Sequence, residues 1–290
     1  MMVRWLVANF IRQTARQKIS EAAAGAAKAD AGGASGQPSP LPPCEIAFVF
    51  SLAIESDGLV TMLDPRVTTR CASYLEHAGR LEQRSVVGAE TGLGARAAEN
   101  ATEDILAVHH PAWIVCAGFA GALDPQLRRG DILMAEHVAD LHGNKLSIGF
   151  KMDPRSAETI PGLRLGTLLS VDGLIRAPSE RRRLGEQHGA AACDMETMAV
   201  ARICRRRKVR FLSVRVITDA LDDRLPVEVE RLLAQKTIAG KLGAATGAVF
   251  KRPSSIKDMW RVREQALKAS DRLAKFLGGV APQLADAAAP

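Results

Sequence analysis

Short apolar runs alternate with amphipathic stretches along residues 44–250. The apolar runs predict buried strands, which cover residues 46–50, 84–89, 113–117, 131–135, 165–171 and 210–217. The amphipathic stretches predict helices over residues 95–108, 181–188, 195–207 and 226–249. Strands that alternate with helices in this way are typical of a mostly parallel sheet covered by helices on both faces. The pattern therefore predicts an α/β fold.

The N-terminal segment follows a different pattern. Residues 3–19 place Trp5, Leu6, Phe10 and Ile11 beside four basic side chains, which is typical of a basic amphipathic helix. The apolar run is too short to span a bilayer, and no small-residue cleavage site follows it as in a signal peptide. Such a helix would lie on a membrane surface, or dock on its own domain or on a partner. The sequence leaves these alternatives open.

Two boundaries follow from composition. Residues 22–43 consist mainly of Ala, Gly, Ser and Pro, which cannot bury a core and read as a linker. After Pro253, apolar residues recur at helical spacing and predict an amphipathic terminal helix; they are Ile256, Met259, Trp260, Leu267, Leu273 and Leu277. We therefore divide the chain into an N-terminal segment with linker, 1–43, a catalytic domain, 44–250, and a C-terminal helix with tail, 251–290.

The net charge argues against nucleic-acid binding. The chain of 290 residues carries a formal charge of +7, but residues 1–43 and 251–290 carry +3 and +4, which leaves the predicted domain neutral. A nucleic-acid-binding domain concentrates basic residues on its folded part. The arginine runs 181–183 and 205–207 read as solvated helix faces, because no set of aromatic side chains accompanies them.

Cysteine and histidine usage points to a reducing compartment. The five cysteines are scattered without metal-type spacing, and the six histidines form no ligand cluster. Cys116 and Cys193 lie in apolar surroundings and read as small buried hydrophobic residues. We expect a cytoplasmic protein without a metal site.

Acidic residues stand where predicted elements meet loops. Asp194 and Glu196 open the helix at 195–207, and the strand at 210–217 ends in Thr218 and Asp219. Ligands of open α/β sheets bind outside the carboxyl ends of the strands, so both places suit a reaction site. The alternative is that Asp194 and Asp219 only cap helices.

Two glycine-containing segments follow predicted strands. Thr91–Gly94 comes before a helix, where glycines let backbone N–H groups approach a ligand, but a plain turn has the same composition. The spacing is not that of a dinucleotide fingerprint. Residues 117–125 allow close approach of a ligand or of another strand, and a tight crossover fits them equally well.

Together these segments resemble the nucleoside phosphorylase/nucleosidase superfamily, most closely its 5′-methylthioadenosine/S-adenosylhomocysteine nucleosidase branch. The resemblance covers about residues 45–250, and the matching segments stand in the family's order. They are Ser51–Glu55, Thr91–Gly94, Gly118–Asp124, Gly130–Asp131, Ser170–Ile175, Asp194–Ala201 and Arg215–Asp219. The resemblance implies a single-domain, three-layer α/β fold with a central mixed sheet, a homodimer, a nucleoside substrate, a place in methionine salvage, and no cofactor.

The resemblance also implies two catalytic acids. Glu55 would position and activate water, and it is preferred to Asp57 because it lies closer to the end of the strand. Asp219 would protonate adenine at N7. Breaking an N-glycosidic bond leaves an oxocarbenium-like sugar and a poor leaving group, so an acid on the base and a carboxylate on the water fit an inverting hydrolase. Asp219 then needs a raised pKa, which burial can supply.

The remaining implied contacts bind the nucleoside. Glu196 would hold the ribose hydroxyls, and Thr91 lies near the sugar, at a position where a serine is common. Leu174 and Ile175 would contact adenine in a place where the family often has an aromatic residue. The full set of implied substrate-binding residues is Glu196, Met195, Thr91, Gly92, Gly118, Leu174 and Ile175.

Two other functions remain open. A purine nucleoside phosphorylase, for which an adenosylated lipid is one candidate substrate, would need a phosphate site, but no arginine lies in residues 51–55 or directly before Thr91. The basic N-terminal segment is the one feature that favours a lipid substrate. A non-catalytic nucleoside-binding module is less consistent with the joint presence of Glu55, Glu196 and Asp219.

Overall fold

The structure is a computed structural model that describes residues 44–150, 152–223 and 254–286, without the side chains of residues 254–262. These residues belong to one compact unit that spans residues 43–290, so the C-terminal helix shares a unit with the predicted domain. None of the described helices is long and apolar enough to cross a bilayer.

The elements alternate as the sequence pattern predicts. The strands are β1 (Ile46–Phe50), β2 (Arg66–Arg70), β3 (Leu75–Leu81), β4 (Arg84–Glu90), β5 (Trp113–Ala122), β6 (Ile132–Asp140), β7 (Lys145–Ser147), β8 (Leu163–Ser170), β9 (Ala192–Asp194) and β10 (Arg210–Asp219). The described helices are α2 (Ala53–Thr61), α3 (Ala95–His109), α4 (Pro154–Glu158), α5 (Pro178–His188), α6 (Thr197–Arg207) and α9 (Ser254–Asp286).

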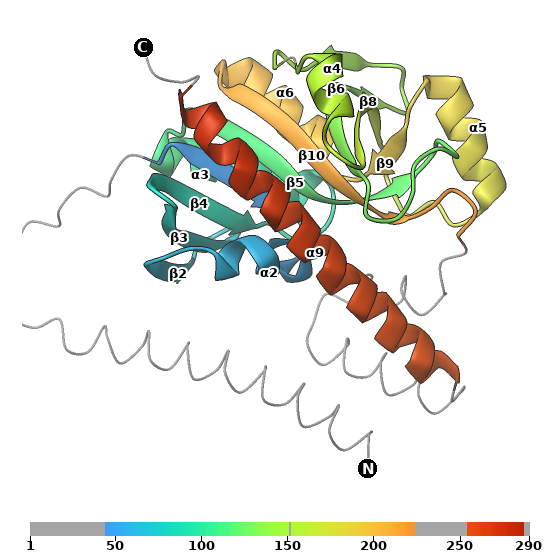
Figure 1. Ribbon diagram of the computed structural model, residues 1–290. Coiled ribbons are helices and arrows are strands. Elements are labelled where there is room, and N and C mark those ends of the chain that lie inside the picture. Colours follow the sequence, from blue (N-terminus) through green and yellow to red (C-terminus); the bar gives the residue numbers. More distant parts are fainter. Residues whose placement is uncertain (1–43, 151, 224–253, 287–290) are drawn as a thin grey trace, which may run out of the picture. The chain divides into compact units, whose positions relative to one another are not determined.

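The strands form one mixed sheet in the order β10-β6-β8-β9-β5-β1-β4-β3-β2, with β7 attached to β6. β1 is parallel to both β4 and β5, and β5 is parallel to β10. Because β10 also pairs with β5, the strands β5, β10, β6, β8 and β9 pair in a closed cycle. The sheet is thus open at β2 and closed on itself at its other half (Figure 1).

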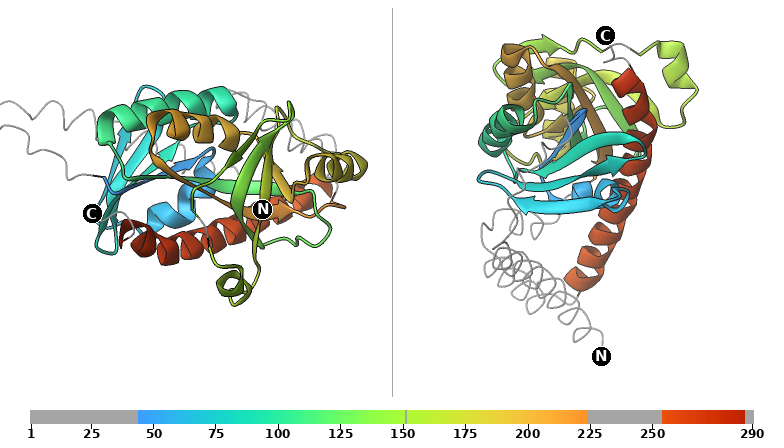
Figure 2. Two further views of the ribbon diagram at one scale, coloured as in Figure 1. Left: turned by 90° about the horizontal axis from the view of Figure 1, so that it is seen from above. Right: turned by 90° about the vertical axis from the view of Figure 1, so that its left-hand side faces the viewer.

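Helices cover both faces of the sheet and give three layers. The views of Figure 2 place α3 and α6 on one face and α2 and α9 on the other. Each face has its own hydrophobic cluster. Ile105 of α3 and Ile203 of α6 are fully buried on the first face, and Leu59 of α2 packs with Leu273 of α9 on the second. The fold is therefore a mixed α/β sandwich with a central sheet, as predicted.

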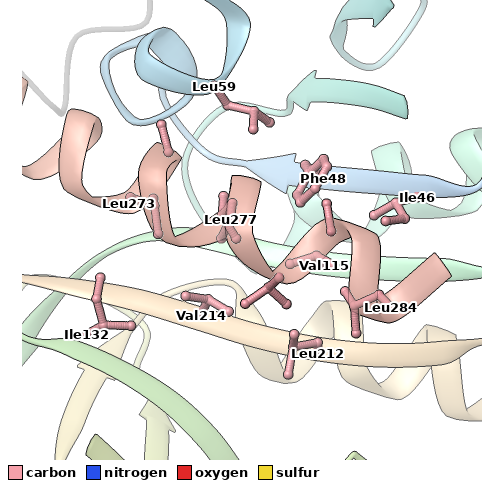
Figure 3. Close-up of a cluster of buried hydrophobic side chains, with 14 of the residues drawn as sticks. Ile46, Phe48, Leu59, Val115, Ile132, Leu212, Val214, Leu273, Leu277 and Leu284 are labelled. Carbon is pink, nitrogen blue, oxygen red and sulfur yellow. The ribbon is translucent and has the colours of Figure 1, made fainter. Parts of the chain in front are cut away.

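The C-terminal helix α9 is an integral part of the second core (Figure 3). Leu273, Leu277 and Leu284 are at most 1% exposed and lie against Phe48 of β1 and Val214 of β10. Burying a leucine side chain contributes about 1.5–3 kcal/mol. Among the described side chains of the predicted apolar stripe, Leu273 and Leu277 are thus buried in this unit, whereas Leu267 is 36% exposed.

α2 and α9 approach closely at a glycine. A Cβ atom on Gly58 would lie 2.7 Å from the carbonyl oxygen of Ser270 and 2.9 Å from Cβ of Ala274. The Ser270 hydroxyl accepts the backbone N–H of Gly58 at 2.9 Å and donates to the Glu55 carbonyl at 3.4 Å. The C-terminal helix therefore fixes the helix that carries Glu55.

The structure differs from the sequence-based elements at several places. The strand expected at 113–117 does not stop at Gly118 but continues to Ala122, because small residues let it bend and pair with β9. Residues 53–61 form the helix α2, which was not predicted. Both the sheet and α9 bury this helix, so its sequence lacks the one-sided apolar stripe that would have indicated it. The strands β2, β3, β7 and β9 were also missed. The helix predicted at 226–249 lies outside the described residues.

Predicted burial of the cysteines is confirmed. Cys116 and Cys193 are buried, and burial raises the pKa of each thiol to about 12. Both thiols are therefore protonated and unreactive at neutral pH.

We expect the close contact at Gly58 to limit stability. Gly58→Ala should lower the free energy of unfolding by about 1–3 kcal/mol, because the added methyl group overpacks the α2–α9 contact. Gly279→Ala is the matched control: a Cβ there meets no atom within 4 Å, so better helix propensity should raise stability by up to about 1 kcal/mol. Urea denaturation measures both. Equal effects of the two substitutions would contradict the contact.

Candidate active site

The predicted acids gather where parallel strands end. Glu55 lies in the first turn of α2, just after β1, and Asp219 is the last residue of β10. Thr91 directly follows β4, and its backbone N–H donates to the carbonyl of Phe50 at the end of β1. This is the edge of an α/β sheet at which ligands bind.

Backbone N–H groups surround the Glu55 carboxylate. Oε2 accepts the N–H groups of Ser51 and Leu52 at 2.9 and 2.8 Å, and Oε1 accepts that of Phe119 at 2.8 Å. Burial raises the pKa of Glu55, while the charge of Arg215 and these three hydrogen bonds act in the opposite direction. The net direction is a raised pKa, and the three backbone donors are the contacts that support an ionised carboxylate able to act as a base.

Gly118 makes room for this carboxylate. A Cβ atom on Gly118 would lie 2.8 Å from Glu55 Oε1 and would also overlap the Arg215 guanidinium. Gly118 and Arg215 are register partners on β5 and β10. The missing side chain lets Arg215 and Glu55 occupy the space above β5, so this position requires glycine for steric reasons.

Arg215 is the buried cation of the site. Its Nη2 donates to Asp194 Oδ2 at 2.5 Å, to the Thr197 hydroxyl at 2.7 Å and to Cys116 Sγ at 3.0 Å. The Arg215 and Asp194 side chains are each only 1% exposed. An isolated charge in the interior is strongly unfavourable, so Asp194 is the counter-ion that this guanidinium requires, although the buried Nε of Arg215 has no hydrogen-bond partner among the described residues.

Glu196 meets the glycine-rich segment. Its Oε1 accepts the N–H of Gly94 at 2.7 Å, across 102 residues of sequence, and its Oε2 accepts the N–H of Met195 at 3.2 Å. Burial and the negative charge of Asp194 together raise the pKa of Glu196 to about 7, against the lowering effects of Arg215 and the Gly94 hydrogen bond. Glu196 thus titrates near neutral pH.

A bulge presents Asp219 at the end of β10. The pairing with β5 shifts register between Ile217 and Asp219, so Thr218 has no register partner on β5 and Asp219 pairs with Gly121. Bulges redirect side chains and recur next to active sites. Gly118, beside Glu55, and Gly121 are three residues apart on β5, which corresponds to about 10 Å at about 3.3 Å per residue. Both acids therefore lie along the C-terminal half of β5.

The surroundings of Asp219 favour its protonated form. Burial raises its pKa, while a hydrogen bond from the Thr218 hydroxyl at 2.8 Å and the charges of Arg181 and Arg129 lower it. Asp223 acts to raise it. The raised pKa that an acid catalyst needs is thus supplied by burial, as the sequence suggested.

Residues 53–249 match the family model described as the Phosphorylase superfamily, which is more than half of the chain. The chain belongs to the phosphorylase superfamily. This membership agrees with the mixed sheet and with the acids at its strand ends.

Relatives within the superfamily are distant. The chain is 26% identical over 184 residues to a 5′-methylthioadenosine/S-adenosylhomocysteine nucleosidase of Staphylococcus epidermidis, which covers 56% of this chain and 81% of the relative. Among solved structures, the Helicobacter pylori nucleosidase of the same name has a TM-score of 0.63 at 16% identity, covering 84% of this chain and all of that one. The H. pylori futalosine hydrolase has a TM-score of 0.61 at 15% identity, covering 83% and 98%. These structural similarities concern the fold.

The other predicted substrate-binding residues of this superfamily member fall into two groups. Thr91 is buried, and the segment it begins reaches Glu196 through Gly94; Gly92 and Met195 lie beside these residues in the chain. Ile175 is half-buried in the loop between β8 and α5, and Leu174 beside it is 36% exposed. The first group lies with Glu55, and the second is linked to the Asp219 end of the site.

Asp194 does more than cap a helix. It accepts the N–H of Thr197 at 3.0 Å, as a capping residue would, and it also receives the hydroxyl of Ser170 at 2.8 Å and the guanidinium of Arg215. The N-cap position of α6 is Glu196, so Asp194 accepts the first N–H of the helix from two residues before the cap, and the capping interpretation is only partly right.

Sequence reasoning missed two buried arginines. Arg215 stands in the apolar run Val214–Ile217, and a charge within a buried strand was a signal that it has a partner. Arg181 was assigned to a solvated helix face, which is wrong: it is 1% exposed, whereas its neighbours Arg182 and Arg183 are exposed. A run of three arginines does not show which of them lies on the buried face of α5, so the burial of Arg181 could not be predicted.

The described residues contain no group of three His, Cys, Asp or Glu side chains suited to a metal ion. A cavity of about 520 Å³ lies at the opposite end of β5 and β10, near their first residues Trp113 and Arg210. Its lining carries no acid, so it is distinct from the cluster of predicted catalytic residues.

We expect Arg215→Met to be strongly destabilising. Removing the cation leaves the buried Asp194 carboxylate without its counter-charge, which should cost about 3–5 kcal/mol of unfolding free energy. Arg202→Met is the matched control, because Arg202 pairs with Asp140 but is 53% exposed and should contribute at most about 1 kcal/mol. Urea denaturation at neutral pH compares the two variants. The double variant Arg215→Met/Asp194→Asn should recover part of the loss; no recovery would contradict the ion pair.

Proposed function

We propose that this protein hydrolyses the N-glycosidic bond of adenine nucleosides of the methylthioadenosine or S-adenosylhomocysteine type and releases adenine. Glu55 activates the attacking water, and Asp219 donates a proton to N7 of the base. Glu196 accepts hydrogen bonds from the ribose hydroxyls. Thr91, Gly92, Gly118 and Met195 line the sugar side, while Leu174 and Ile175 contact the base.

One observation carries the choice of water over phosphate. The N–H groups of Ser51 and Leu52, at the start of α2, point at the Glu55 carboxylate and are within 2.9 Å of it. Amides at a helix N-terminus are a natural anion site, and here the protein's own carboxylate fills it. A phosphate dianion would lose these donors and would be repelled by Glu55, whereas a neutral water is attracted. This supports hydrolysis.

The division of labour between the acids supports the same reaction. Burial raises the pKa of both Glu55 and Asp219, but Glu55 accepts three backbone N–H groups that support its ionised form, whereas Asp219 accepts a single hydroxyl among the described residues. Pairs of carboxyl groups with opposite protonation states are the working parts of inverting glycosidases. Protonation makes adenine a better leaving group while the water attacks from the other side of the sugar.

The identity of the 5′ substituent rests on the relatives. The curated relatives are named for methylthioadenosine and S-adenosylhomocysteine, and a futalosine hydrolase has the same fold. We propose the methylthio or homocysteinyl substituent, a homodimer whose neighbouring subunit completes the 5′ pocket, and a cytoplasmic role in methionine salvage. The N-terminal segment 1–43 is proposed to lie outside the catalytic machinery.

The proposal is tested by incubating the purified full chain with methylthioadenosine, S-adenosylhomocysteine, adenosine and inosine, with and without phosphate, and measuring base release. We expect phosphate-independent release of adenine from the first two compounds. Asp219→Asn should reduce the rate by at least about 10²–10⁴-fold, because the amide cannot donate the proton.

The alternatives give different results in the same assay. Formation of a sugar 1-phosphate that depends on phosphate would identify a phosphorylase. Tight nucleoside binding without any base release, equal in wild type and Asp219→Asn, would identify a binding module. Near-normal activity of Asp219→Asn would reduce Asp219 to a structural residue.

A pH dependence follows from Glu196. In the free protein its pKa is raised to about 7, so the carboxylate that accepts both ribose hydroxyls is lost as the pH falls through this value. We expect kcat/KM for methylthioadenosine to fall below pH 7 in the wild type. Glu196→Gln should lower kcat/KM and remove this acid limb. Persistence of the limb in Glu196→Gln would assign it to another group.

A further inference from the structure

Arg181 is a buried arginine that the proposed reaction does not use directly. It belongs to the run Arg181–Arg183 on α5, but its side chain is among the largest that are fully buried in the described residues. Its two neighbours are exposed: Arg182 pairs with Asp222 and Arg183 with Glu180 at the surface. Burying a guanidinium is unfavourable unless its donors are used, so its contacts indicate what it holds.

The guanidinium joins two loops that lie far apart in sequence. Nε donates to the carbonyl oxygen of Ile175 at 2.9 Å, and Nη1 donates to the carbonyl oxygen of Ala220 at 2.9 Å. Ile175 lies in the loop between β8 and α5, and Ala220 directly follows Asp219. One rigid, planar group therefore fixes both loops at once.

The position of Arg181 is set by the strand that faces Asp219. Its Cζ lies 3.8 Å from where a Cβ of Gly121 would be, and Gly121 is the register partner of Asp219. The charge of Arg181 therefore acts on the Asp219 carboxyl group. The other charged or titratable groups that act with it around this end of the site are Arg129, Asp223 and Cys193.

We propose that Arg181 is a positioning residue that ties the base-contacting loop at Ile175 to the acid loop at Asp219–Ala220 and lends its charge to the acid. The proposal rests on the proposed function, in which these loops hold and protonate the base. Base recognition and base protonation then depend on the same guanidinium. Loss of the Arg181 hydrogen bonds would therefore displace both the loop that contacts the base and the loop that carries the acid.

Substitutions of Arg181 separate its charge from its hydrogen bonds. Arg181→Met removes both, so the Asp219 carboxyl group should stay protonated to higher pH and the alkaline limb of kcat/KM should move upward. Arg181→Lys keeps the charge but cannot span both carbonyls, so the limb should stay in place. In an Asp219→Asn background, Arg181→Met should weaken methylthioadenosine binding by about tenfold or more, the loss expected for hydrogen bonds from a charged group.

Arg182→Met is the matched control, because it is one residue away, exposed and paired only at the surface. It should leave the pH limb and the binding constant unchanged. Thermal melting and circular dichroism show whether each variant is folded. If Arg181→Met does not fold, Arg181→Gln, which retains donors without charge, serves for the same pH measurement. A folded Arg181→Met or Arg181→Gln with the wild-type limb and wild-type binding overturns the proposal.

Hydrogen–deuterium exchange tests the tie without any substrate. Exchange of residues 171–177 and 219–223 should increase together in Arg181→Met and remain at the wild-type level in Arg182→Met. Unchanged exchange in Arg181→Met overturns the proposal even if the enzyme cleaves nucleosides. Conversely, absent adenine release by the wild type would reject the proposed function while this measurement still decides the role of Arg181.

Discussion

The acidic half of the site depends on one buried guanidinium. Arg215 bonds Asp194 and Thr197, and its charge also acts on Glu55 and Glu196. These carboxyl groups come from α2 and from the connection between β9 and α6, so the cation on β10 holds distant segments in one place. Like charges at such short range would otherwise repel or take up protons. Electrostatics, as well as packing, therefore determines how the strand ends are arranged.

The reaction site is thus supported from three directions. Arg215 organises the acids proposed to lie on the sugar side, and Arg181 connects the loops proposed to lie on the base side. α9 contacts α2 at Gly58, so a helix more than 200 residues later in the chain fixes the helix α2, whose first turn carries Glu55. Each support acts on backbone or on a buried carboxylate, which explains how short loops keep a defined geometry.

Much of the fold and part of the site could be predicted from the sequence. The strand Ile46–Phe50 and the helix near 95–109 were predicted because each has a plain apolar pattern bounded by polar residues. Asp219 and Glu196 were found because acids at strand and helix ends stand out. Arg215 and Arg181 were not, since their partners lie 6 to 99 residues away; a charge within an apolar run signals that Arg215 has a partner, but no local pattern identifies it. The course of β5 beyond Gly118 likewise depends on β9, a distant partner.

The closed cycle of strands restricts how copies of this protein can associate. Within the described residues, β5, β10, β6, β8 and β9 have both neighbours over at least part of their length, and the strand that extends this half, β7, is only three residues long. At the other end of the sheet the edge strand β2 is fully exposed and begins and ends with arginine, which disfavours pairing with a second strand. Neither end offers a long apolar edge. Assembly of subunits is therefore left to helices and loops, and the sheet is protected from the edge-to-edge growth that leads to aggregates.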